Sequence, residues 1–307
     1  MAKSQSGFNR RSTTEQVTEG IDLSGKTILI TGVNSGLGYE SMRVLAMRGA
    51  HVIGAARTLE KAQAACDSIE GRTTPIACEL GDPASVVACA REIISQFEVI
   101  DVLMANAGIM SPADLSLIND YASPLEAQFA TNHMGHFVLI HHLLPLLKRA
   151  TQGRIVLLSS MGHVQSPKGG IDFDNLDCHQ GYNPWETYGQ SKLANILCAR
   201  HLNTLLADTA VTANAVHPGV IKTNLSRNSA GLMFRVIQFF ANFVERTVPQ
   251  GAATQCYVAT HPSLATTGGE YFADCNIKQP SDYALDDALA SRLWDESVIL
   301  AAAYLDG

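Results

Sequence analysis

Short apolar runs recur along the chain, each bounded by glycine, proline or polar residues. The runs are rich in β-branched residues, which is typical of strands buried in the middle of a sheet. They predict strands at residues 26–31, 51–56, 74–78, 100–105, 154–159, 211–216 and 270–273.

Segments with a helical pattern alternate with these strands. Asp82 and Pro83 mark one helix start, because aspartate caps a helix N-terminus and proline fits the first turn. Strands that alternate with helices form βαβ units with right-handed crossovers, so we expect an α/β fold with a doubly wound parallel sheet and helices on both faces. The expected helices lie at residues 40–48, 59–69, 124–149 and 186–207, with one more starting at Asp82.

The same pattern predicts a single domain. No repeat, low-complexity segment or linker divides residues 21–307, and residues 1–20 form a polar stretch that we expect to be a flexible N-terminal extension. Arg10 and Arg11 lie in this extension, but no apolar stretch follows them, which disfavours an export signal. No run of about 18 apolar residues occurs, so we expect no integral membrane segment.

Composition narrows the function classes. Of 307 residues, 46% are hydrophobic and 17% are charged, which is a globular balance. A net charge of −7 gives no electrostatic footprint for nucleic acid, so we expect no nucleic-acid partner. The seven cysteines contain no CxxC pair, and such scattered cysteines fit a reducing compartment, so we predict a cytoplasmic protein.

A glycine-rich turn follows the first predicted strand. Glycines let the backbone turn sharply and approach a pyrophosphate, and the next helix directs its N-terminal N–H groups at that anion. Glycines also make ordinary turns, but the flanking strand and helix are those of a Rossmann-type dinucleotide site. We expect cofactor contacts from Gly32, Asn34, Ser35, Gly36, Leu37 and Gly38.

Tyr188 and Lys192 stand four residues apart in a predicted helix, so their side chains share one face. An ammonium close to a phenol favours the phenolate and lowers the pKa of the tyrosine from about 10. A tyrosine tuned in this way can exchange a proton with an alcohol or carbonyl oxygen near neutral pH. Taken alone, such a pair is usually a solvated surface pair.

Three further features favour a catalytic pair over a solvated surface pair. Ser160 ends a predicted strand, where its hydroxyl can reach a ligand above the sheet. Asn132 lies inside a long predicted helix, where asparagine has no propensity reason to be. Pro218 follows another strand and leads to Thr223. Histidines 133, 136, 141 and 142 share the helix of Asn132, but the HExxH signature is absent, so we expect no metal site.

The TGxxxGxG turn and the order of these residues resemble the short-chain dehydrogenase/reductase family from about residue 21 to near the C-terminus. The resemblance implies that Ser160 donates to the substrate oxygen and that Tyr188 is the acid/base. It implies that Lys192 tunes Tyr188 and anchors the ribose, and that Asn132 belongs to a water relay. It also implies cofactor contacts from Asn106, Ala107, Gly108, Tyr188, Lys192, Pro218 and Thr223.

Local strings resemble the retinol-dehydrogenase-like branch of that family, among them residues 24–27, 250–254 and 269–272. One position departs from the family pattern, because Glu79 stands where an aspartate usually meets the adenine amino group. The longer carboxylate of Glu79, with Leu80 beside it, fits either an adenine contact or a surface position.

The end of the second predicted strand favours NADP(H) over NAD(H). Enzymes that prefer NAD place a carboxylate there to accept from the ribose 2′-OH, and Ala56 holds that position here. Arg57 follows at once, and a guanidinium can hold a 2′-phosphate with paired, charge-assisted hydrogen bonds. The alternative is a solvated Arg57 at the start of the next helix.

Residues 232–245 carry an apolar stripe with Phe240 at its centre and polar residues opposite. By the resemblance, residues from about 225 to 250 form a substrate lid. The stripe also fits a helix packed on the core, a membrane-surface contact or a dimer contact. The predicted helices at 124–149 and 186–207 resemble those that pair in family oligomers, so we expect a homodimer or homotetramer.

The sequence therefore predicts an oxidoreductase that moves a hydride between NADP(H) and a carbonyl or alcohol carbon of a hydrophobic small molecule. One alternative is a cofactor-binding regulatory protein without turnover, although such proteins usually lose the tyrosine or the lysine that this chain keeps. An extended-type epimerase or a light-driven reductase is disfavoured by the spacing of the glycine-rich turn and by the Asn-Ala-Gly motif.

Overall fold

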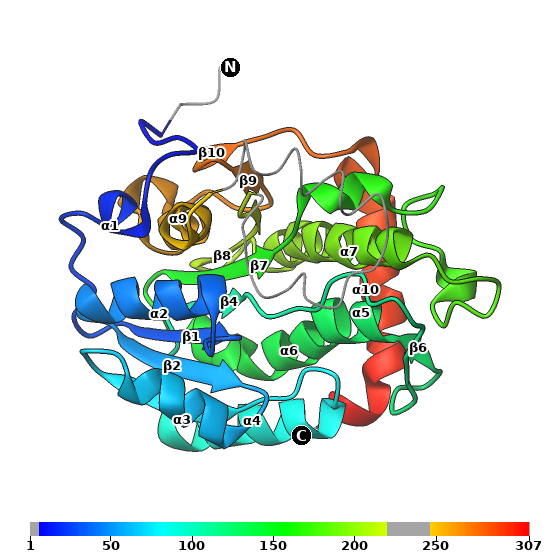
Figure 1. Ribbon diagram of the computed structural model, residues 1–307, viewed down its shortest axis with the longest axis horizontal. Coiled ribbons are helices and arrows are strands. Elements are labelled where there is room, and N and C mark those ends of the chain that lie inside the picture. Colours follow the sequence, from blue (N-terminus) through cyan, green and yellow to red (C-terminus); the bar gives the residue numbers. More distant parts are fainter. Residues whose placement is uncertain (1–5, 220–245, 307) are drawn as a thin grey trace.

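The seven strands expected from the apolar runs, together with a short strand that was not expected, form one eight-stranded sheet in the computed structural model, which describes residues 6–219 and 246–306 (Figure 1). The strand order is β10-β9-β8-β7-β4-β1-β2-β3. The strands are β1 (Thr27–Thr31), β2 (His51–Ala56), β3 (Thr73–Ala77), β4 (Val102–Ala105), β7 (Gly153–Leu158), β8 (Val211–His217), β9 (Tyr271–Ala273) and β10 (Asn276–Ile277).

The strand order reverses in the middle of this sheet. β1 pairs in parallel with β2 and β4, for example Ile28 with Val52 and with Val102. β3 lies outside β2, whereas β7, β8 and β9 continue from β4 toward the opposite edge. Only β10, which pairs with β9, is antiparallel among the described strands of this sheet. A reversal between β1 and β4 is the point at which such sheets hold ligands, at the carboxyl ends of the strands.

Helices cover both faces of the sheet, which confirms the predicted fold class. One face carries α2 (Gly36–Met47), α3 (Leu59–Asp67) and α9 (Val248–Thr260), and the other carries α4 (Pro83–Gln96), α6 (Gly135–Lys148) and α7 (Pro184–Leu205). Ile28 and Ile30 pack toward the first set and Leu29 toward the second, and all three are 0% exposed. Burial on both faces explains why the strands read as unbroken apolar runs.

Helix starts follow their capping residues. Asp82 caps α4, since its Oδ1 accepts from the N–H groups of Ala84 and Ser85 at 2.9 and 3.2 Å. α2 begins at Gly36, four residues before the predicted start, so its N-terminus lies inside the glycine-rich turn. The short helical turns are η2 (Met161–Gln165), η3 (Phe173–Asn175), η5 (Pro262–Leu264), η6 (Asp282–Leu285) and η7 (Ala302–Tyr304).

The helix predicted at residues 124–149 starts at Ala127 in the structure, three residues later than predicted, and contains a π-helical turn. The segment begins with β6 (Leu125–Glu126), which pairs with β5 (Leu117–Ile118), and continues through α5 (Ala127–Phe129) and the π-helical turn η1 (Ala130–Met134) into α6. Glu126 separates strand from helix, because its Oε2 accepts from the N–H groups of Gln128 and Phe129. A buried cap of this kind starts the helix later than the apolar pattern predicts.

The N-terminal segment also differs from the expected flexible extension over residues 6–20. α1 (Thr14–Val17) packs against α2 and α9, and Val17 is 1% exposed. Thr14 Oγ1 donates to the Glu40 carboxylate, and Arg43 pairs with Glu15 at 2.8 Å. A buried apolar contact and an ion pair therefore hold this segment against the domain.

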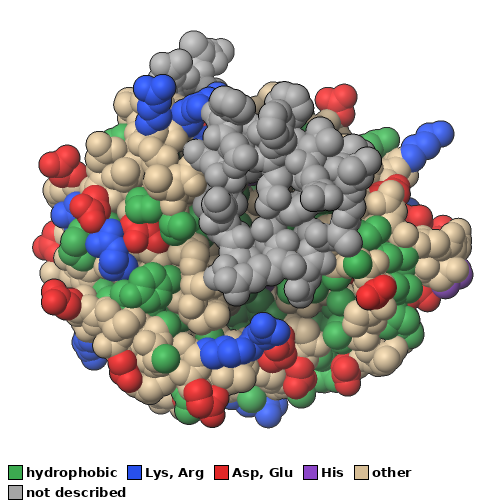
Figure 2. Space-filling model, viewed as in Figure 1, with side chains coloured by type: hydrophobic (Ala, Val, Ile, Leu, Met, Phe, Trp, Pro, Cys, Tyr) green, Lys and Arg blue, Asp and Glu red, His purple; other side chains and the backbone are tan. Residues whose placement is uncertain are grey.

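A helix that the sequence reading missed lies on the outside of the molecule. α10 (Asp287–Ala301) packs along α7, and Figure 1 shows it in red at the flank. Among the described residues, no helix has both the length and the hydropathy needed to cross a bilayer. Figure 2 shows basic and acidic side chains interspersed over the described part of one face.

Candidate active site

The glycine-rich turn between β1 and α2 is shaped for close backbone approach. Gly32 has a φ of +76°, which favours glycine. A Cβ on Gly38 would lie 2.3 Å from the Gly32 carbonyl oxygen and 2.6 Å from the Asn106 amide nitrogen. Ser35 caps α2 in an extended conformation without a side-chain cap hydrogen bond, and both Asn34 and Ser35 are exposed. The cradle and the helix N-terminus suit a pyrophosphate.

The loop after β4 is fastened to this turn. Asn106 Nδ2 donates to the Thr31 carbonyl oxygen at 2.7 Å. The hydroxyl oxygen of Thr31 accepts from the backbone N–H groups of Asn106 and Ala107, both at 3.0 Å. Two neighbouring strand ends thus form one surface at the switch point of the sheet.

The side chain of Asn132 forms hydrogen bonds with the far end of the loop after β4. Its Oδ1 accepts from Ile109 N–H at 2.8 Å, and its Nδ2 donates to the Ile109 carbonyl oxygen at 3.0 Å. Nδ2 also donates to Ser191 Oγ at 2.9 Å. A Cβ on Gly108 would lie 2.8 Å from Asn132 Oδ1 and 3.3 Å from Lys192 Nζ, so only glycine permits this approach.

Tyr188 and Lys192 share one face of α7 and are 7% and 4% exposed. Lys192 Nζ donates to the Leu158 carbonyl oxygen at 3.1 Å and lies 5.7 Å from the centroid of the Tyr188 ring. Burial lowers the pKa of Lys192 to about 8. The pair is therefore not the solvated surface pair that the motif alone would suggest.

The pKa of Tyr188 differs from the sequence expectation of a lowered value. Burial raises it, and the hydrogen bond with the Ser160 side chain opposes that effect only in part. The physical reason is geometric, because Lys192 Nζ faces the ring while burial penalises the phenolate. The phenol is therefore protonated at neutral pH.

The two adjacent serines, Ser159 and Ser160, differ in the exposure of their hydroxyl groups. Ser159 is 2% exposed and donates to the Lys192 carbonyl oxygen at 2.7 Å. Ser160 is half-buried beside Tyr188, and its Oγ accepts from Gly162 N–H at 3.0 Å. This arrangement supports the choice of Ser160 as the substrate-facing serine.

The remaining predicted cofactor residues lie at the same edge of the sheet. Arg57 is exposed at the end of β2, makes no hydrogen bond or ion pair with the described residues and follows the buried Ala56. The Glu79 carboxylate folds back to accept from Gly81 N–H at 3.2 Å. Leu80 is 3% exposed and packs against the backbone of α6.

Part of the prediction falls outside the described residues. Pro218 lies next to the end of the first described stretch, after β8, and its carbonyl oxygen accepts from Arg246 at 3.3 Å. Thr223, Phe240 and the substrate lid predicted at about 225–250, up to residue 245, lie beyond it. Within the described residues, no group of three or more His, Cys, Asp or Glu side chains is arranged to hold a metal ion.

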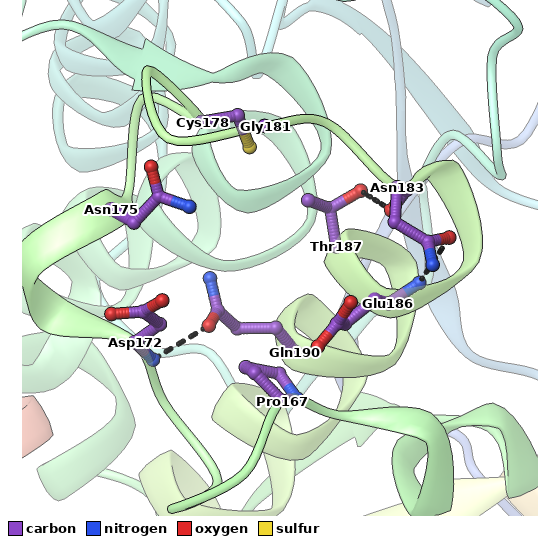
Figure 3. A pocket seen from close by; sticks show the side chains of 9 residues that line it. All are labelled: Pro167, Asp172, Asn175, Cys178, Gly181, Asn183, Glu186, Thr187 and Gln190. Atoms are coloured by element: carbon purple, nitrogen blue, oxygen red, sulfur yellow. Dashed lines mark hydrogen bonds between the residues drawn. The ribbon is translucent and has the colours of Figure 1, made fainter.

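A separate small recess of about 70 Å³ opens beside the first turns of α7 (Figure 3). Gln190 lies in its wall, and its Oε1 accepts from Asp172 N–H at 2.8 Å. Gln190 is two residues from both Tyr188 and Lys192, which places it on the opposite side of the helix. The recess is lined by Pro167, Asp172, Asn175, Cys178, Gly181, Asn183, Glu186, Thr187 and Gln190, none of them a predicted site residue.

Sequence reasoning missed the supporting role of Ser191 and Thr31. Ser191 Oγ donates to the Tyr188 carbonyl oxygen at 2.8 Å while it accepts from Asn132. The only signal in the sequence is the place of each residue beside a motif residue, since their partners come from distant elements.

The chain is similar in sequence to known dehydrogenases over most of its length. The family model described as short chain dehydrogenase matches residues 26–172. The chain is 42% identical to short-chain dehydrogenase TIC 32 A, chloroplastic, from Brassica napus, over 96% of this chain and 95% of that protein. It is 36% identical to retinol dehydrogenase 13 from Homo sapiens, over 91% of this chain and 85% of that protein.

A solved structure has the same architecture. An uncharacterised protein from Mycobacterium paratuberculosis superposes with a TM-score of 0.73 at 32% identity, covering 92% of this chain and 95% of that one. Identity of this level over almost the whole chain accompanies the TGxxxGxG turn, the Asn-Ala-Gly loop and the Tyr188–Lys192 pair. The chain belongs to the short-chain dehydrogenase/reductase family of oxidoreductases, which act on alcohol and carbonyl groups, and to its retinol-dehydrogenase-like branch.

Proposed function

We propose that this protein transfers a hydride between NADP(H) and a carbonyl or alcohol carbon of a hydrophobic small molecule, with Tyr188 as the acid/base. One observation carries the proposal. Tyr188 and Lys192 on α7, Ser160 after β7 and Asn132 in η1 come from three separate segments and meet at the switch-point edge of the sheet, beside the glycine-rich turn.

Each residue has a task in carbonyl reduction. The bound nicotinamide cofactor supplies the hydride. Tyr188, protonated because burial raises its pKa, gives its proton to the carbonyl oxygen, and Ser160 donates a second hydrogen bond to that oxygen. Lys192 then favours the phenolate that remains. Asn132 holds the backbone at Ile109, where it would support a water relay that returns the proton.

The end of β2 supports NADP(H). Ala56 offers no carboxylate to the ribose 2′-OH, while the guanidinium of Arg57 is exposed and has no partner among the described residues. A 2′-phosphate would supply that partner. The proposed adenine contact is Glu79, after the neighbouring strand β3.

The substrate side supports an apolar ligand. Met161 and Val164 lie just after Ser160 and are 57% and 59% exposed, so they offer apolar surface beside the proposed substrate-facing serine. The lid at about 225–250 and a homodimer or homotetramer belong to the same proposal. The cytoplasmic location stays a prediction, since the relative from Brassica napus is described as chloroplastic.

The test is turnover of purified protein with NADPH or NADH on aldehydes and ketones of increasing chain length. We expect oxidation of NADPH, with kcat/KM rising along each series because each buried CH₂ contributes about 0.8 kcal/mol. Tyr188→Phe should lower kcat by roughly 10²–10⁴ with NADPH affinity nearly unchanged. Tyr283→Phe, on η6, is the control and should keep wild-type turnover. Binding of NADPH without turnover on any carbonyl would instead favour the regulatory protein.

A further inference from the structure

A buried histidine connects the two halves of the site described above. His136 lies in the first turns of α6 and is 1% exposed. Its Nε2 lies 2.9 Å from Thr31 Oγ1, at the glycine-rich turn. Its Nδ1 lies 3.0 Å from the backbone carbonyl oxygen of Asn132. One imidazole ring thus spans the distance between the cofactor turn and the segment that carries Asn132.

The partners of Thr31 determine where the proton of this ring lies. Thr31 Oγ1 already accepts from the backbone N–H groups of Asn106 and Ala107. Its own O–H must therefore donate, and His136 Nε2 at 2.9 Å is closer than the Met104 carbonyl oxygen at 3.5 Å. Nε2 is then the acceptor, so Nδ1 carries the proton and donates to the Asn132 carbonyl.

The ring keeps this tautomer at neutral pH. Burial lowers the pKa of His136 to about 4, so the imidazole is neutral. A neutral ring with one donor and one acceptor matches the two groups that it faces.

Asn132 lies within the π-helical turn. In η1 the backbone N–H of Gly135 donates to Ala130, five residues back, which shifts the hydrogen-bond register by one residue. The side chain of His136 bonds the Asn132 carbonyl within this turn. The Asn132 side chain in turn holds Ile109 by both its N–H and its carbonyl.

Resting on the function proposed above, we propose that His136 is a positioning residue, which holds Asn132 in register with the glycine-rich turn through Thr31. It acts through Asn132 and Thr31 and makes no contact with Tyr188 or Ser160 among its described hydrogen bonds. Loss of the ring would free the π-helical turn to slide relative to the loop after β4.

The first test measures whether Asn132 keeps its position and does not depend on enzyme activity. Hydrogen exchange at the Ile109 amide measures whether Asn132 holds its partner. His136→Phe should lower protection of this amide at least tenfold, whereas His136→Gln, which keeps a donor and an acceptor, should restore part of it. Ser297→Ala is the matched control, because it removes the hydroxyl that bonds His133 Nε2 at 3.0 Å, and it should leave Ile109 protected.

A measurement on the wild-type protein covers the case in which His136→Phe does not fold. Nitrogen chemical shifts of ¹⁵N-labelled histidine report which ring nitrogen carries the proton. We expect a protonated Nδ1 and an unprotonated Nε2 at His136. A protonated Nε2, or unchanged Ile109 protection in His136→Phe, overturns the proposal.

Kinetics separate positioning from a loss of folded protein. His136→Phe should lower kcat about ten- to a hundredfold with KM for NADPH little changed, and should shift the pH profile of kcat. The double variant Thr31→Val, His136→Phe should lower kcat about as much as the more impaired single variant, because both substitutions break the same chain of hydrogen bonds. A kcat loss with an unshifted profile contradicts the proposal. Failure of the proposed function would appear separately, as a wild-type protein that reduces no carbonyl.

Discussion

Arg57 and Ala56 stand side by side at the end of β2, and their contrast predicts the cofactor preference. A hydrogen bond to a charged group contributes about 1.5–3 kcal/mol, or roughly ten- to a hundredfold in affinity. Arg57→Ala should therefore weaken NADPH binding by about that factor and leave NADH binding nearly unchanged. Dissociation constants from cofactor fluorescence or calorimetry measure both.

The neighbouring exposed cation Lys61, on α3, gives the control for Arg57. Lys61→Ala changes the net charge equally, so it should alter NADPH affinity far less than Arg57→Ala. Equal losses in the two variants, or tighter binding of NADH than NADPH by the wild-type protein, would count against a specific 2′-phosphate contact.

For single residues, the sequence predicts which side chains belong to the site but not how deeply they are buried or what they contact. Tyr188 and Lys192 could be placed on one helix face from their spacing, yet burial reverses the expected pKa shift of Tyr188. His136 reads as an ordinary core histidine, because its partner Thr31 is 105 residues away. Hydrogen bonds between distant elements leave no periodic trace in the sequence.

Among the elements, the central strands such as β1 and β4 were predictable because they are buried on both faces and read as apolar runs, whereas the two-residue strands β5, β6 and β10 were not. The π-helical turn η1 was not, since a shift of one hydrogen bond changes no periodicity. α9 was not predicted either, although the capping box of Thr247 and Gln250 at its start is a recognisable sequence signal. α10 likewise begins at an aspartate cap, Asp286.

Trp294 anchors α10 to the rest of the fold. Its ring lies 4.9 Å from the Phe137 ring and 5.1 Å from the His201 ring, measured between centroids. Trp294→Ala should lower the free energy of unfolding by about 2–3 kcal/mol, less than the roughly 3–5 kcal/mol of a fully buried aromatic, because Trp294 is half-buried. Urea unfolding measures the change.

Ile299 on the same helix is 60% exposed and provides the comparison. Ile299→Ala should change the free energy of unfolding by no more than about 0.5 kcal/mol. A Trp294→Ala protein as stable as the wild type would mean that α10 does not depend on this contact.

For the whole molecule, α10 bears on the expected oligomer. It covers part of the surface of α7, one of the two helices through which family oligomers were expected to pair. A homodimer or homotetramer stays a prediction, and its interface would have to include α10 or avoid this side of α7.

Buried histidines make the stability of the whole molecule depend on pH. Burial lowers the pKa of His133 to about 3 and those of His136 and His217 to about 4, from 6.5. Above pH 6.5 these rings are neutral in both states, so they do not affect stability. Below it the unfolded chain binds protons that the folded protein does not, so stability falls.

We therefore expect these three rings together to take up about three protons on unfolding near pH 5.5, which costs on the order of 1 kcal/mol per pH unit for each of them. Urea unfolding at pH 7, 6 and 5.5 gives the slope. His217→Gln should reduce the uptake by about one proton. A free energy of unfolding that stays constant over this range would contradict the buried neutral state of these rings.

The placement of α1 has a consequence for biosynthesis. Its main partner α9 consists of residues 248–260, so α1 finds most of its binding surface only after about 230 further residues have been made. β1, β2, β3 and β4 can pair much earlier, and β7, β8 and β9 then add one after another at a single edge. Until α9 has been made, α1 can contact only α2 of these two helices, so we expect its full docking to be a late step in folding.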